Sequence, residues 1–321
     1  MKTRLTDTGS TQRESSAVAD LRWEFIDLAF LAYIAVILIL LLVFGVLLGR
    51  LSHPWPMIWL NVLFGAAGLG ARSLSSIRDN AFTRFIRWWY PPILFFFCFK
   101  SLASIIHLIQ PEFIDPFLIA ADQFLFGGPV TEWLQQRAQP WLTEIMYFCY
   151  TSYYFFIPGI GIPLYLRCGR DRTSPEGDQV REFLAVVSVS MLFCYIHYLM
   201  IPGAGPVFWA DYPGPVLTLT GGPITLFEQW VFKHGAVVGA AFPSSHVVIT
   251  MVTAFYSARF RVAPFVWVPL AIGILISTMY NGYHYGVDVL YGMIIATVMV
   301  SVVPPLFRRY ETRFTRRSLE T

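Results

Sequence analysis

Two histidines lie in short polar stretches of the chain, and each stretch opens an apolar segment. His246 ends the run 242–246, and Asp288 follows His284 by four residues. On a helix, residues i and i+4 share a face, so Asp288 can accept the Nδ1–H of His284 and leave Nε2 free to attack phosphorus. His246 can protonate a leaving alkoxide and then deprotonate an incoming alcohol or water. These residue types predict phosphoryl transfer, with His284, His246 and Asp288 as the catalytic residues.

Ser244 and Ser245 precede His246 where a helix is predicted to begin. Free amides and the helix dipole favour an anion there, so we expect both serines to bind a phosphate. Two other interpretations fit the same residues. The histidines could merely cap helices at a membrane interface, or His284, Asp288 and His246 could bind a metal. No further His, Cys or acidic cluster surrounds these positions, so we expect neither a metal nor another cofactor.

Lys100 stands inside an apolar segment, where a charge is costly and by default indicates a function. Lys100, Ser104 and His107 have the spacing of one helical stripe. This stripe could donate to the phosphate or line a polar cavity. The alternative is a buried pair between Lys100 and Asp115 or Asp122.

Two other basic positions are weaker candidates. Lys233 lies thirteen residues before His246, where it could bind phosphate or belong to a solvated loop. His197 lies near the end of an apolar segment, and we expect it to be structural.

The composition indicates a polytopic membrane protein. The chain has 56% hydrophobic and only 13% charged residues, whereas soluble domains average about 25% charged. Its net charge of +3 gives no sign of nucleic-acid binding. We therefore predict an all-α fold, a bundle of about eight transmembrane helices. The predicted spans are 27–49, 54–71, 89–110, 144–166, 183–201, 242–258, 264–281 and 285–306.

The positive-inside rule orients these spans. Of the 23 Lys and Arg residues, all but Arg50, Lys100, Arg137 and Lys233 fall in the tails and connections of one side. Both termini should therefore be cytoplasmic, and both histidines should lie at the non-cytoplasmic face.

The domain organisation follows from the same pattern. We expect a flexible cytoplasmic tail without a signal peptide over 1–26, one transmembrane catalytic domain over 27–306, and a basic cytoplasmic tail over 307–321. The long outer connections, 111–143 and 202–241, are rich in Pro, Gly and Trp. We expect short interfacial helices in the first and a functional loop in the second.

Around the histidines, the chain resembles the type 2 phosphatidic acid phosphatase superfamily. That family carries three motifs, KxxxxxxRP, PSGH and SRxxxxxHxxxD. The second reads Pro243-Ser244-Ser245-His246 here. The third reads Ser277-Thr278, then His284 and Asp288, with Thr278 in place of arginine. The first is absent before span six. These departures, with FPSxH and HYxxD, are similar to the branch that contains inositol phosphorylceramide synthase and sphingomyelin synthase.

The resemblance implies a six-helix phosphatase-like core, an outward-facing site without a metal, and a phosphohistidine intermediate on His284. It also implies that His246 is the acid and base and that Asp288 orients His284. The missing arginine leaves open which group neutralises the phosphate, and Lys100 or Lys233 could take its place.

Together these features predict an integral-membrane lipid phosphotransferase, similar to inositol phosphorylceramide synthase. It would act in a bacterial inner membrane or an organelle membrane, with a phospholipid or lipid phosphate as donor and a lipid or water as acceptor. One alternative is a phosphatase for phosphatidic acid-type or polyprenyl phosphates. A second is a non-catalytic transporter or scaffold.

Overall fold

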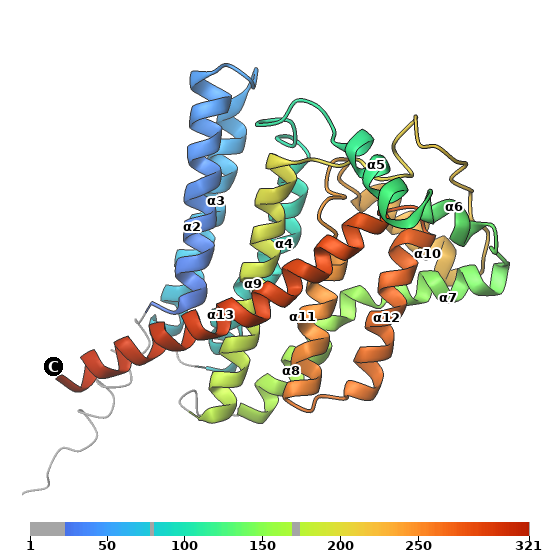
Figure 1. Cartoon of the computed structure of the whole chain (residues 1–321). Coiled ribbons are helices and arrows are strands. Elements are labelled where there is room, and N and C mark those ends of the chain that lie inside the picture. The colour runs from blue at the N-terminus through green and yellow to red at the C-terminus, as the bar shows by residue number, and fades with distance from the viewer. Residues whose placement is uncertain (1–22, 78–79, 169–173, 321) are drawn as a thin grey trace, which may run out of the picture.

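The computed structural model describes residues 23–77, 80–168 and 174–320, and these residues form helices joined by turns (Figure 1). Their only β-type pairing is an isolated bridge between Gly203 and Ala240. The helices are α2 (Phe25–Leu40), η1 (Leu41–Leu47), α3 (Pro54–Ile77), α4 (Ala81–Leu102), α5 (Asp115–Phe126), α6 (Val130–Gln135), α7 (Pro140–Thr151), α8 (Tyr153–Cys168), α9 (Pro175–Met200), α10 (Pro223–Gly235), α11 (Ser245–Arg259), α12 (Pro264–Tyr280) and α13 (Gly286–Glu320).

The prediction of an all-helical chain is confirmed, and every predicted span overlaps a helix or a pair of consecutive helices, although the span 89–110 extends eight residues past the end of α4. By length and composition, four helical segments of the described chain can cross a bilayer: α2 with η1, α3, α9 and α13. The bent pair α7–α8 raises the number to five. The helices on the other predicted spans, α4, α11 and α12, are shorter or more polar. The two long connections, 111–143 and 202–241, contain α5, α6 and α10, and the first connection thus holds the short helices expected there.

The long helices begin at residues that satisfy their first amides. At α4, Asn80 Oδ1 accepts from Thr83 N at 3.0 Å, and Thr83 Oγ1 accepts from Asn80 N at 3.1 Å. At α9, Ser174 Oγ accepts from Gly177 N at 3.1 Å, and Pro175 occupies the first helical position, where no amide is needed. α4 therefore starts eight residues before the predicted span.

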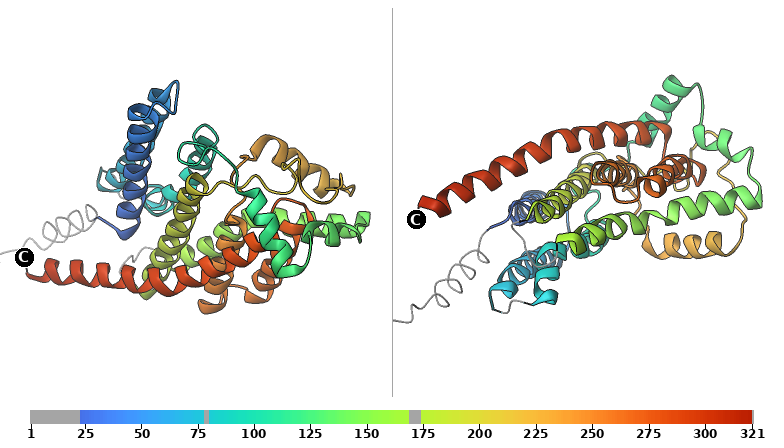
Figure 2. Two further views of the ribbon diagram at one scale, coloured as in Figure 1. Left: turned by 45° about the horizontal axis from the view of Figure 1, so that its top comes forward. Right: turned by 90° about the horizontal axis from the view of Figure 1, so that it is seen from below.

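α9 forms the centre of the bundle and packs against α2, α4, α8, α11 and α13. α13 lies on one side of α9 and α11, while α8 lies on their other side (Figure 2). α9 is buried along most of its length. Its sequence is accordingly apolar on several faces, as expected of a helix enclosed by others.

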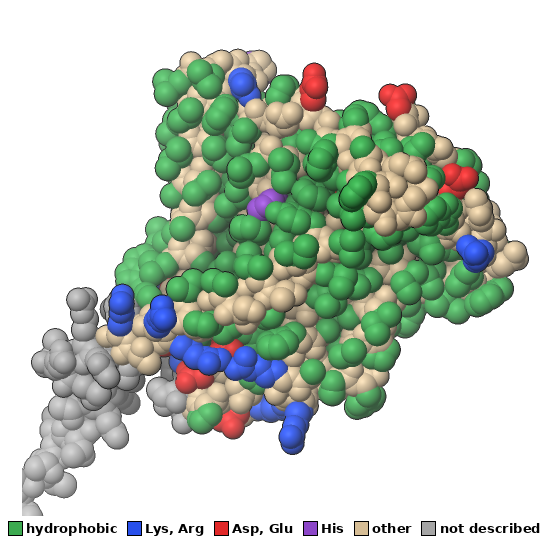
Figure 3. Space-filling model, in the orientation of Figure 1, with side chains coloured by type: hydrophobic (Ala, Val, Ile, Leu, Met, Phe, Trp, Pro, Cys, Tyr) green, Lys and Arg blue, Asp and Glu red, His purple; other side chains and the backbone are tan. Residues whose placement is uncertain are grey.

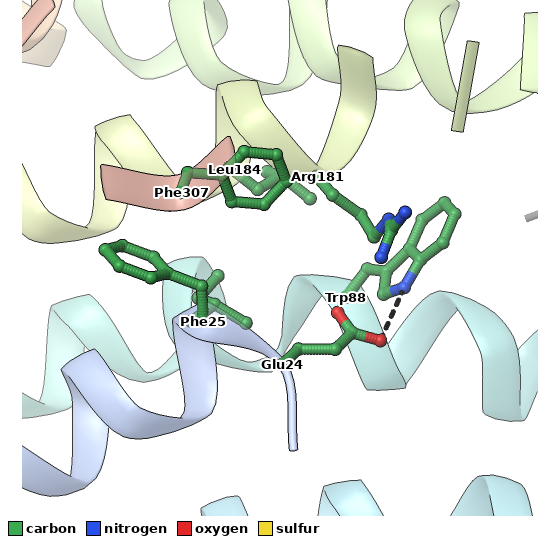
Figure 4. Close-up of a pocket in the computed structure, with 7 residues that line it drawn as sticks. Glu24, Phe25, Trp88, Arg181, Leu184 and Phe307 are labelled. Atoms are coloured by element: carbon green, nitrogen blue, oxygen red, sulfur yellow. Dashed lines mark hydrogen bonds between the residues drawn. The ribbon is translucent and has the colours of Figure 1, made fainter. Parts of the chain in front are cut away.

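A buried ion pair fastens α2 to α4. Both guanidinium Nη atoms of Arg87 donate to the carboxylate of Asp27, at 2.7 and 2.5 Å, and each residue is 1% exposed. Tyr90 Oη donates to the same carboxylate at 2.9 Å. Beside it, Trp88 Nε1 donates to Glu24 Oε1 at 3.3 Å in a small pocket that Arg181 also lines (Figure 4).

Most basic side chains of the face seen in Figure 3 gather at one end of the bundle. Figure 3 shows Lys and Arg side chains along the lower edge and a broad hydrophobic surface above them. At this end, Arg308 Nε donates to Glu182 Oε2 at 3.0 Å, and Arg181 donates to Glu311 at 2.8 Å. These pairs connect α9 to the C-terminal part of α13.

Some sequence predictions fall outside the described residues. They concern nearly all of the predicted N-terminal tail, residues 1–22, and three of the arginines that were used to orient the spans, Arg78, Arg170 and Arg172.

The Arg87–Asp27 pair predicts a large effect on stability. Asp27→Asn leaves a buried guanidinium with a neutral partner, and breaking such a pair costs about 3–5 kcal/mol. We expect a clearly lower melting temperature for the purified protein in detergent. The control is Asp178→Asn, since the Asp178 side chain is 59% exposed and pairs with Arg181 at the surface; it should cost about 1 kcal/mol or less. Equal melting temperatures for the two variants would contradict the prediction.

Candidate active site

The structure brings the two predicted histidines together. His246 is the second residue of α11, and His284 precedes α13 by two residues. The centroids of their rings are 5.8 Å apart. Both side chains line one cavity of about 500 Å³, a size typical of small-molecule sites.

A backbone carbonyl orients His284. Nδ1 of His284 lies 2.9 Å from the carbonyl oxygen of Ala241 and 3.4 Å from Asp288 Oδ2. A carbonyl can only accept, so Nδ1 carries the hydrogen and Nε2 has the free lone pair. The sequence analysis gave this task to Asp288 alone. It also placed both residues on one helix, which is wrong, because α13 begins at Gly286.

Asp288 is fully buried and joins the turn before α13 to the helix. Its Oδ2 accepts from Tyr285 N at 3.0 Å and faces His284. Its Oδ1 has no hydrogen-bond partner among the described residues. The carboxylate is therefore placed to stabilise positive charge on the His284 ring.

Two tyrosines of the α7–α8 bend hold His246. The Tyr150 ring stacks on the imidazole at 4.7 Å with an angle of 28°, and the Tyr153 ring lies at 4.3 Å with an angle of 47°. Nδ1 of His246 has no hydrogen-bond partner among the described residues. Ring packing rather than hydrogen bonding therefore fixes this histidine. The sequence analysis missed both tyrosines, although the tyrosine-rich stretch 147–154 was a visible signal.

One loop ties the two histidine motifs together. Gly203 O accepts from Ala241 N at 2.9 Å, and Val207 N donates to Gly282 O at 2.9 Å. Within this loop, between Gly203 and Val207, Gly205 has φ +92°, and a Cβ there would lie 2.6 Å from Tyr283 O. Only glycine combines this backbone angle with so close an approach.

Two buried carboxylates of α5 hold the same loops from behind. Asp115 accepts from Ala204 N at 2.7 Å, from Gly205 N at 2.9 Å and from Tyr285 Oη at 2.7 Å. Asp122 accepts from Gly286 N at 2.9 Å and from Val287 N at 2.7 Å. Asp122 thus provides the N-terminal cap of α13 from another helix. The sequence analysis weighed these acids only as partners of Lys100, and neither bonds to it.

Glu228 of α10 adds a carboxyl group to the cavity. It is 1% exposed, and Thr151 Oγ1 donates to its Oε2 at 3.1 Å. Desolvation by burial raises the pKa of Glu228 to about 7, although hydrogen bonds from Thr151 and Tyr154 act in the opposite direction. The group is therefore neutral below about pH 7. Nothing in the local sequence of 223–235 distinguishes it from a solvated glutamate.

The structure places the predicted phosphate-binding residues in different surroundings. Ser245 lines the cavity. Ser244 is fully buried and caps α11, with its Oγ accepting from Val247 N at 3.4 Å. Lys233 is exposed on α10. Lys100 Nζ donates to the carbonyls of His234 and Gly235, at 3.2 Å each, so it caps the C-terminus of α10.

The predicted stripe of Lys100, Ser104 and His107 is wrong, because α4 ends at Leu102 and turns follow. His197 bonds to its own helix through Phe193 O at 3.1 Å and lies 3.5 Å from Tyr291 Oη. It lies outside the cavity lining.

The cavity is largely aromatic and lacks a basic residue. None of the lysines and arginines in the described ranges lines it, and Glu228 is its single acidic residue. Nor do any three His, Cys, Asp or Glu residues of those ranges cluster closely enough to hold a metal ion. The two imidazoles, Ser245 and the tyrosine hydroxyls of the lining are thus the groups available to an anion.

The part of the chain that contains this site matches a known protein family. The sequence profile of the PAP2 superfamily matches residues 116–302, which run from α5 into α13 and include both histidines. No curated protein and no solved structure matches the chain.

The environment of Glu228 predicts a titration near neutral pH. In an infrared pH titration, a protonated carboxyl band should disappear as the pH rises through about 7. Glu228→Gln should remove the component of this band that titrates near 7, and Glu112→Gln, at an exposed position, should leave the band unchanged. Thr151→Val should shift the transition to higher pH, because it removes a donor to the charged form. A band that does not titrate near neutrality would contradict this assignment.

Proposed function

The chain belongs to the PAP2 superfamily, whose members are typically lipid phosphatases or phosphotransferases, and on this basis we propose that it is an integral-membrane lipid phosphotransferase. It moves a phosphate-linked headgroup from a donor phospholipid to a lipid alcohol through a phosphohistidine at His284. The observation that carries this proposal is the meeting of two imidazoles, from separate helices, in one apolar cavity.

In the first step, Nε2 of His284 attacks the phosphorus of the donor. The N–P bond forms while the bond from phosphorus to the lipid oxygen breaks. His246 becomes protonated when the anionic donor binds beside it, and it gives this proton to the departing alkoxide. The Ala241 carbonyl keeps the hydrogen on Nδ1, and the Asp288 carboxylate stabilises the positive ring.

In the second step, neutral His246 takes the proton of an incoming alcohol. The new O–P bond forms as the N–P bond breaks, which regenerates His284. If water takes the place of the alcohol, the same step is hydrolysis. The aromatic lining of the cavity disfavours ordered water and accommodates a lipid alcohol, which supports transfer over hydrolysis.

The charge of the cavity favours a phosphodiester donor. A diester carries one negative charge, whereas a phosphate monoester carries about −1.5 to −2 at pH 7. A cavity with one carboxyl group and without Lys or Arg in its described lining stabilises a dianion poorly. This comparison supports a headgroup-bearing donor and argues against phosphatidic acid-type or polyprenyl monophosphates, the substrates of the alternative phosphatase.

The distribution of charge supports the proposed orientation. The connection between α11 and α12 and the end of α13 lie at the end of the bundle that is rich in Lys and Arg (Figures 1 and 3). The starts of α11 and α13 lie toward the opposite end (Figure 1). By the positive-inside rule, the basic end is cytoplasmic, so we propose that the site faces the non-cytoplasmic side.

The test is turnover of a phospholipid labelled in its headgroup phosphate, with and without a ceramide or diacylglycerol acceptor. A labelled new phospholipid indicates transfer, and released phosphate or phosphorylated headgroup indicates hydrolysis. Folded protein without any turnover would favour the transporter or scaffold and contradict the proposal.

We expect His284→Ala to abolish this turnover, because it removes the nucleophile that takes up the phosphoryl group. His246→Ala should lower the rate about 10²–10⁴-fold. His197→Ala is the matched control, since this histidine lies outside the cavity lining, and it should keep normal activity. A chelator should have no effect. Wild-type rates in His284→Ala would remove this residue from the mechanism.

Asp122 is a positioning residue that acts through the turn before α13. Asp122→Asn weakens the bonds to Gly286 N and Val287 N, and a shift of about 1 Å in a reacting group can cost about 10²-fold in rate. We expect kcat to fall by about that factor while KM changes little. Asp211→Asn, at an exposed position of an outer connection, is the control. A raised KM with normal kcat would show that Asp122 acts on binding instead.

A further inference from the structure

One wall of the cavity comes from outside the family-matched region. α4 precedes residue 116, where the match begins. It lines the cavity with Trp89, Pro92, Ile93, Phe95, Phe96 and Phe99. Most of these positions recur at intervals of three and four and form one helical face. The chemistry and this wall therefore belong to different parts of the chain.

Trp89 lies at one end of the cavity, where α4 and α8 approach each other closely. A Cβ added to Gly161 of α8 would lie only 2.7 Å from the Trp89 ring. Just beyond, Phe85 and Trp88 each pack edge-on against Tyr165 at 5.7 Å. Both helices line the cavity on the other side of Trp89. Trp89 itself is 5% exposed and stacks on Phe85 at 5.3 Å.

The dimensions of this part of the cavity fit a hydrocarbon chain. From Phe99 to Trp89, α4 rises about 15 Å, which equals half of the roughly 30 Å hydrocarbon core of a bilayer. Along this length the cavity is open toward the surface, since Ile93 and Phe96 of α4 and Tyr154 of α8 are exposed. A lipid whose phosphate lies at the histidines could therefore place a chain between α4 and α8.

The wall is fixed at both ends. Near Trp89, the buried pair of Arg87 with Asp27 holds α4 to α2. At the other end, Lys100 holds α4 to the C-terminus of α10, and α10 contributes Glu228 and Phe232 to the cavity. A wall held in this way can discriminate by length.

We propose that α4 is the selectivity wall of the site and that Trp89 sets the length of the hydrocarbon chain that the cavity accepts. This inference rests on the proposed function, which supplies the lipid. Each methylene that finds a place in the cavity should change affinity about fourfold, and a chain that reaches Trp89 gains nothing from further carbons.

The experiment compares kcat/KM for donor phospholipids that differ only in chain length. Trp89→Ala removes the end of the cavity, so the ratio of long-chain to short-chain kcat/KM should rise at least about tenfold. Ile93→Trp fills the middle of the wall and should lower the ratio. Trp59→Ala is the matched control, because it makes the same change at an exposed tryptophan of α3 that does not line the cavity.

Normal turnover with an unchanged length preference in both Trp89→Ala and Ile93→Trp would overturn the inference and leave the proposed function intact. If wild-type protein turns over no lipid, the proposed function fails. Binding of single-chain alkyl methyl phosphates of graded length, which are phosphodiesters with one negative charge, is measured by native mass spectrometry and then tests Trp89 independently. A shift toward longer chains in Trp89→Ala would support the wall, and identical length profiles would refute it.

Discussion

Backbone amides that lie inside an apolar protein need acceptors, and in this molecule two carboxylates of α5 supply them. Asp115 takes two amides of the loop after α9, and Asp122 takes the first two amides of α13. Unsatisfied, each of these amides would cost free energy where water has little access. The turn that carries His284 lies between these anchored points, so its geometry depends on α5 more than on any contact of the histidine itself.

The two histidines are supported in different ways, and the difference suits the different tasks that we propose for them. His284 is held by directional bonds that present one nitrogen. His246 is held by the faces of Tyr150 and Tyr153, with Nδ1 left without a protein partner among the described residues. A nucleophile needs a fixed direction of attack, whereas a group that gives and takes protons needs a nitrogen that substrate oxygens can reach.

The sequence predicted the positions of the helices better than the long-range contacts between them. Apolar segments located the helices, and the spacing of polar residues located His246, His284 and Asp288. Asp115, Asp122 and Glu228 could not be assigned, because their partners lie some 77 to 170 residues away and no local pattern encodes such pairs. The stripe with Lys100 failed for a local reason, since its spacing fits a helix that in fact ends at Leu102.

Side-chain substitutions cannot remove the acceptor that orients His284. It is the main-chain oxygen of residue 241, which every amino acid possesses. Replacing the side chain of Ala241 therefore leaves the acceptor in place, and an alanine scan of the whole chain would never delete it. Asp288, the visible partner, can be substituted while the tautomer persists. This contact therefore depends on the backbone conformation of the loop. Substitutions that change this conformation, such as those at Gly205, are the ones that can abolish it.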